Sequence, residues 1–186
     1  MKTQTKILMR IMLLAIFCLF ITRCSTEQLN LEGNLQENAL TSRTVNSKKS
    51  DKVKFNFTTH LSGDNEFPNP VETNATGQAI VRISEDESWI YYKLIVANIE
   101  NVTMSHFHMA EAGANGGPVV WLYNNINGQP SGTSNGILAE GVIMADDIIG
   151  GLAGNMSGLI WAIRNGKIYV NVHTVAYPGG ELRGQL

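Results

Sequence analysis

From residue 53 onward, the chain alternates between apolar and polar residues in short runs. The stretch VKFNFTTHL (53–61) has an apolar residue at most of its odd-numbered positions, namely Val53, Phe55, Phe57 and Leu61. A period of two is typical of a β-strand that turns one face to a core and the other to solvent. This stretch is therefore predicted to be a half-buried strand.

Similar apolar runs follow at short intervals, and residues that favour turns separate them. The predicted strands after the first cover residues 77–83, 89–99, 102–110, 118–123, 137–144, 167–175 and 180–186. The intervening segments, such as GANGGP and YPGG, are rich in glycine, proline and asparagine. The pattern predicts an all-β domain: an antiparallel, Greek-key-like β-sandwich or barrel of about seven or eight strands.

One segment has helical spacing. Apolar side chains recur there every three or four residues, at Met156, Leu159, Ile160 and Ile163, and Asn165–Gly166 provides a stop signal. We predict one short helix near residues 155–165, packed over an end or edge of the sheets, with Met156 and Trp161 in the core.

The N-terminal region has the layout of a secretory signal peptide. Lys2, Lys6 and Arg10 come before an apolar run of eleven residues (11–21), which is too short to cross a bilayer. The sequence ITRC, ending at Cys24, resembles a bacterial lipobox, although Arg23 stands where a small residue is usual. Residues 1–24 are therefore predicted to be a signal peptide, with either lipidation at Cys24 or ordinary cleavage after it.

Residues 25–52 contain no aromatic side chain and few apolar ones, so we expect a flexible polar linker there. The domain that follows, residues 53–186, carries six basic residues against twelve acidic ones, a net charge of −6 with neutral histidine. An acidic surface repels phosphate backbones, which argues against a nucleic-acid partner. We expect contact with a membrane only through a lipid anchor.

Three segments together resemble the CHRD domain, a module first recognised in chordin that also occurs in exported microbial proteins. They are LSGDNEFPNPVETNATGQAIVRI, YYKLIVANIENVTMSHFHMAEAGANGGPVVWLY and GKIYVNVHTVAYPGGELRGQL. The resemblance covers essentially the whole of residues 53–186, which we treat as a CHRD-like domain. It implies a β-rich extracellular module of unassigned biochemistry.

Two histidines occur two residues apart, at His106 and His108, in a predicted strand. Residues i and i+2 of a strand point to the same face, so the two imidazoles lie side by side. If the strand holding His173 neighbours or faces this one, three imidazoles converge. Three imidazoles suit copper or zinc and leave one position vacant.

A second resemblance concerns the copper half of the copper-zinc superoxide dismutase sandwich. The order HFH, glycine-rich turn, VNVHT and GGELRGQL is similar to that family's pattern. By this resemblance His106, His108 and His173 match three copper ligands, and Arg183 matches the arginine that guides anions. The bridging histidine, the zinc-loop histidines and the cysteine pair have no counterparts in this chain, so dismutase activity is not expected.

Two interpretations of the histidines stay open at this point. They either bind metal, or they serve as structural residues that hydrogen-bond to neighbours such as Asn171, Thr174 or Glu181. The residues favour an exported binding or structural module at the cell surface, with a protein or small ligand of unknown kind as its partner. The alternative is a copper or zinc protein that handles metal or a small oxidant, and whether the chain is an enzyme stays open, with a binding role favoured.

Overall fold

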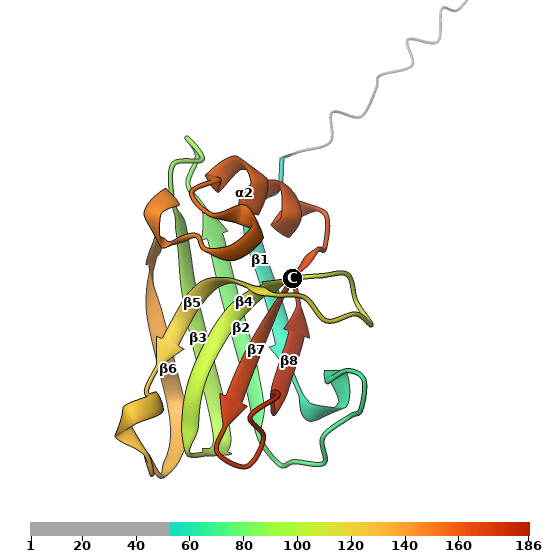
Figure 1. The fold of residues 1–186 in the computed structure, drawn as a ribbon. Helices are drawn as coiled ribbons and strands as arrows, with labels where there is room; N and C mark the ends of the chain where they lie inside the picture. The colour runs from blue at the N-terminus through green and yellow to red at the C-terminus, as the bar shows by residue number, and fades with distance from the viewer. Residues whose placement is uncertain (1–52) are drawn as a thin grey trace, which may run out of the picture. The chain divides into compact units, whose positions relative to one another are not determined.

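The computed structural model describes residues 53–186; the predicted signal peptide (1–24) with Cys24, and the predicted linker (25–52), lie outside the described residues. The described part forms two four-stranded sheets packed face to face (Figure 1). The first sheet contains, in spatial order, β1 (Asn56–Leu61), β2 (Thr76–Ile83), β3 (Ile90–Glu100) and β6 (Thr133–Ile143). The second contains β5 (Pro118–Asn124), β4 (Val102–Met109), β7 (Ile168–Thr174) and β8 (Leu182–Gln185).

Every neighbouring pair of these strands is antiparallel. The chain crosses from the first sheet to the second between β3 and β4, and returns between β5 and β6. It crosses again through the helix α2 (Met156–Arg164), which lies with short helical turns at one end of the sandwich (Figure 1). The predicted Greek-key-like, all-β architecture with one short helix is confirmed.

Short 3₁₀ helices occupy four of the connections in residues 53–186. They are η1 (Gly63–Asn65), η2 (Ile126–Gly128), η3 (Ala145–Asp147) and η4 (Gly150–Leu152). No helix in this part of the chain combines the length and the apolar character needed to cross a bilayer.

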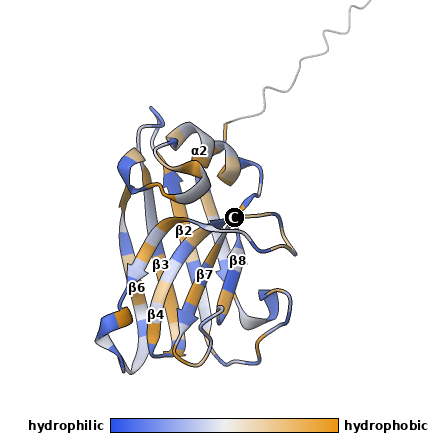
Figure 2. Cartoon of the chain, viewed as in Figure 1, coloured by the Kyte–Doolittle hydropathy of each residue, from blue (hydrophilic) through white to orange (hydrophobic). Residues whose placement is uncertain are grey.

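The hydrophobic core lies between the two sheets, and the strands carry intermixed apolar and polar positions (Figure 2). In β1 the predicted alternation is correct, because Phe57 and Leu61 are buried while Asn56 is exposed. Val53 precedes the strand and is 57% exposed. Strand β7 differs from β1, since all seven of its residues are buried.

Two sequence expectations need correction. Trp161 was expected in the core but is 53% exposed, because at 100° per residue it points away from the stripe formed by Leu159, Ile160 and Ile163. Strand β6 begins at Thr133, four residues before the predicted start. Its first residues resemble a turn in composition, but Asn135 Oδ1 accepts a hydrogen bond from the Asn98 backbone N–H at 2.9 Å and ties this segment to β3.

The strand phase of β1 predicts a contrast between two neighbouring substitutions. Phe57→Asp places an unpaired carboxylate in the core and should lower the free energy of unfolding by about 3 kcal/mol or more. Asn56→Asp changes an exposed position and should have an effect below about 0.5 kcal/mol. Urea denaturation of both variants measures the difference, and equal tolerance at the two positions would contradict the assigned phase.

Candidate metal centre

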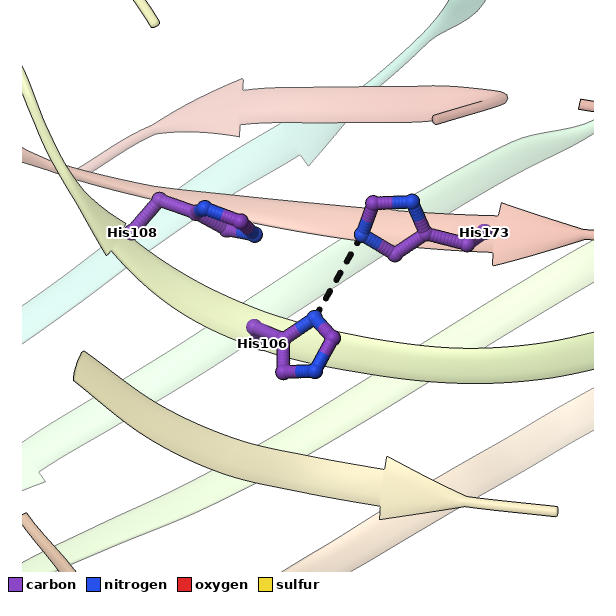
Figure 3. Close-up of side chains that lie close together, drawn as sticks. All are labelled: His106, His108 and His173. Atoms are coloured by element: carbon purple, nitrogen blue, oxygen red, sulfur yellow. Dashed lines mark hydrogen bonds between the residues drawn. The ribbon is translucent and has the colours of Figure 1, made fainter. Parts of the chain in front are cut away.

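The three candidate histidines meet on one face of the second sheet. His106 and His108 lie on β4, and His173 lies on the neighbouring strand β7. The antiparallel register pairs His106 with Asn171 and Met104 with His173, so His106 and His173 are diagonal neighbours. One ring nitrogen from each histidine lies within 4.8 Å of the others. His106 Nδ1 is 3.4 Å from His173 Nε2, and the three rings point toward one another (Figure 3).

This face is the outer side of the sandwich, opposite the core. Phe107, between the two histidines of β4, is fully buried in the core between the sheets, so its neighbours point the other way. His106, His108 and His173 are nevertheless only 4%, 9% and 7% exposed. The loop that follows β4 contacts His108, the loop that follows β7 contacts His173, and the Trp121 ring of β5 packs against His106.

Two of these contacts fix which ring nitrogen carries the proton. His108 Nδ1 lies 2.9 Å from the carbonyl oxygen of Gly116, and His173 Nδ1 lies 3.0 Å from that of Pro178. A carbonyl oxygen only accepts hydrogen bonds, so in both rings Nδ1–H is the donor and Nε2 carries the lone pair. In His173 this lone pair accepts from His106 Nδ1–H at 3.4 Å. Metal-binding histidines are commonly held by such a hydrogen bond from the second ring nitrogen.

The free lone pair of His108 is conspicuous. His108 Nε2 is buried and has no hydrogen-bond partner in the described structure. A buried polar atom without a partner is costly, so it needs a physical explanation. A metal ion bound between the three rings would supply one.

The electrostatics of the cluster keep the three rings neutral. Burial and, to a smaller extent, the neighbouring imidazoles of His173 and His108 lower the pKa of His106 to about 4. Burial also lowers the pKa of His108 and of His173, although the Gly116 and Pro178 carbonyls oppose the shift. Neutral imidazole is the form that binds a metal.

The arrangement fits a small transition-metal ion. Two nitrogens bound tetrahedrally to one zinc or copper ion lie about 3.4 Å apart, the separation already present between His106 Nδ1 and His173 Nε2. The remaining separations are at most 4.8 Å, so the ring nitrogens have to approach one another by at most about 1.4 Å. The resulting donor set is one Nδ1, from His106, and two Nε2 atoms.

Aromatic side chains border the cluster. Trp121, paired with His106 across β4 and β5, has its ring centre 4.1 Å from that of His106 and is 42% exposed. Tyr169, paired with His108 across β4 and β7, stacks on it at 4.9 Å with an interplanar angle of 12°. Strand alternation alone places Tyr169 on the face of His173, whereas its pairing with His108 and that of Trp121 with His106 require the strand register.

Arg183 lies near the cluster, as the second resemblance implied, but it is not open to solvent. The side chain is 3% exposed, and its guanidinium lies over the Tyr169 ring, 3.6 Å from the ring centre. Two guanidinium nitrogens donate to Asn115 Oδ1 and to the Ala114 carbonyl. An anion-guiding role for Arg183 therefore stays a prediction without structural support.

The side chains considered as structural partners of the histidines are used elsewhere. Thr174 Oγ1 donates to Glu181 Oε2 at 2.7 Å, and Thr73 Oγ1 donates to Glu181 Oε1 at 2.7 Å. Asn171 Nδ2 donates to Glu66 Oε2 at 3.3 Å, while burial raises the pKa of Glu66 to about 7. The histidines instead bond to backbone carbonyls and to each other.

The fold and this face define a class of protein: an antiparallel β-sandwich with three buried histidines outside one sheet. A family model, the CHRD domain, matches residues 57–186, which include all three histidines. The chain belongs to the CHRD domain family. No curated protein and no solved structure matched the chain.

The low pKa of His106 predicts a loss of stability in acid. In the unfolded state His106 binds a proton near pH 6.5, and in the folded state only near pH 4. As the pH falls from 6.5 to 4, His106 should therefore lower the free energy of unfolding by up to roughly 3 kcal/mol. Glu66 has the opposite sign, since its pKa is raised on folding. Urea denaturation from pH 7 to pH 4 should therefore show a weaker acid loss for His106→Asn than for the unchanged protein. Parallel pH profiles would contradict the prediction.

Proposed function

We propose that this protein is an exported CHRD module that binds one copper or zinc ion through His106 Nδ1, His108 Nε2 and His173 Nε2. The observation that carries the proposal is the convergence of three neutral imidazoles around the unpartnered Nε2 of His108. Two of the three rings are already oriented by backbone carbonyls. Metal binding then requires small movements of the rings and a change of the His106 tautomer, from the Nδ1–H form that donates to His173 Nε2 to the Nε2–H form.

The donor set favours metal binding over catalysis at this site. All three donors are neutral nitrogens, which suit zinc and copper, and they are less than a tenth exposed. A bound ion would supply Lewis acidity or, in the case of copper, one-electron chemistry at the remaining coordination position. The side chains described here hold and orient the ion; none of them is assigned a proton-transfer step. A metal-holding role is consequently the best supported function.

The cell envelope is the setting that we propose for this module. The support is the N-terminal sequence, with basic residues, a short apolar run and the lipobox-like ITRC ending at Cys24. With Cys18 removed in the signal peptide, Cys24 would be the only cysteine left, so no internal disulfide can form. A metal ion tying β4 to β7 would add stability by another route.

Metal binding is tested by titrating the purified protein with zinc or copper and measuring bound metal by elemental analysis. We expect one ion per chain, and the double variant His106→Ala/His108→Ala should bind at least about 100-fold more weakly. His60→Ala is the matched control, because His60 is exposed on β1 and should leave the affinity unchanged. Absence of stoichiometric metal in the folded, unchanged protein would refute the proposed function.

Lipidation is tested by labelling expressing bacterial cells with an alkyne-tagged fatty acid. The unchanged chain should incorporate the label and partition with membranes, whereas Cys24→Ala should lose both properties. Cys18→Ala is the control, since Cys18 lies within the apolar run that is predicted to be removed. An unlabelled chain whose mature N-terminus is Ser25 would instead show ordinary cleavage after Cys24.

A further inference from the structure

Arg183 is a buried cation, and both of its side-chain hydrogen bonds are made to one loop. It belongs to β8, which is the edge strand of the second sheet, and it pairs with Asn171 of β7. Its guanidinium donates to Asn115 Oδ1 at 2.8 Å and to the Ala114 carbonyl. Both acceptors belong to the loop of residues 110–117, which connects β4 to β5.

The same loop supplies the hydrogen bond that orients His108. The residue after Asn115 is Gly116, whose carbonyl accepts from His108 Nδ1 at 2.9 Å. The Gly116 backbone N–H also donates to the Tyr169 hydroxyl at 3.3 Å. Arg183 thus anchors the two residues that immediately precede the orienting carbonyl.

The position of Gly116 leaves little freedom to this loop. A Cβ atom added at Gly116 would lie 1.9 Å from the Met109 carbonyl oxygen, so the loop backbone passes directly against the end of β4. Only glycine brings the carbonyl to His108 in this way. The Arg183 guanidinium bonds to the two residues just before Gly116 in this close-packed loop.

Ring stacking through Tyr169 also connects Arg183 to His108. Tyr169 lies on β7, between the strands of His108 and Arg183, and its ring stacks with the imidazole on one strand and the guanidinium on the other. A guanidinium is suited to both tasks, because it stacks through its face and donates in its plane. Lysine provides neither the face nor the fork.

We propose that Arg183 is a positioning residue: it holds the loop of residues 110–117 so that the Gly116 carbonyl keeps His108 in the Nδ1–H tautomer, with Nε2 directed at His106 and His173. The part that concerns metal affinity rests on the proposed function. The part that concerns the tautomer holds for the metal-free protein as well. In this role Arg183 acts on the direction of one proposed ligand atom, His108 Nε2, and does not contact an anion.

The test measures the His108 ring by long-range ¹H–¹⁵N correlation spectra of the metal-free protein at neutral pH. The unchanged protein should show a single Nδ1–H tautomer at His108, and Arg183→Gln should show a mixture with the Nε2–H form. Asn115→Ala removes one anchor from an exposed loop position and should shift the tautomer in the same direction without a risk to folding. Arg82→Gln, at an exposed position of β2, is the control.

Metal titration of the same variants completes the test. Arg183→Gln and Asn115→Ala should weaken zinc or copper binding by about 10- to 100-fold, and Arg183→Lys should restore little of it. A pure Nδ1–H tautomer in both folded variants would overturn the positioning role, whether or not metal binds. A tautomer shift in a protein that takes up no metal would support the positioning role and refute the proposed function alone.

Discussion

The pairing of β4 with β7 is the constraint on which the site depends. These two strands occupy the middle of the second sheet, and each alternates between residues that face the core and residues that face the outer loops. The register sets Met104 against His173 and His106 against Asn171, which brings His106 Nδ1 to 3.4 Å from His173 Nε2. A slip of one residue in either strand would turn its histidines into the core and its core residues outward. The hydrophobic core therefore fixes the geometry of the histidines on the opposite face.

Burying three imidazoles next to one another has a cost that the loops only partly offset. The cluster avoids charge repulsion because the pKa values of all three rings are lowered. The carbonyls of Gly116 and Pro178 satisfy one nitrogen each on His108 and His173. The Nε2 atom of His108 stays without a partner, at a cost of about 1–3 kcal/mol. A ligand that accepts its lone pair, such as a metal cation, would recover this energy.

Much of the fold could be predicted from the sequence because its signals are local. A period of two specified the strands, and the spacing from Met156 to Ile163 specified the helix. The placement of His106 and His108 on one face follows from strand geometry alone. Trp161 was assigned wrongly because an apolar side chain in a short helix was equated with a buried one. The start of β6 was missed because its pairing with β3 involves side chains that also favour turns.

The rest of the site could not be derived from motif spacing, because it depends on contacts between distant segments. The convergence of His173 with the β4 pair required the strand order of the second sheet, which residue patterns left open. The orienting role of Gly116 arises from a backbone carbonyl, and side-chain identities carry no signal for it. Arg183 was placed near the site by resemblance, but its hydrogen bonds to Asn115 and Ala114 could be found only from the structure.

Anomalous X-ray scattering from crystals soaked in zinc or copper tests the central claim most directly. The account predicts one strong peak outside the second sheet, about 2.0–2.1 Å from His106 Nδ1, His108 Nε2 and His173 Nε2. A peak coordinated by other residues, or clear density for the three rings with no peak between them, would contradict it.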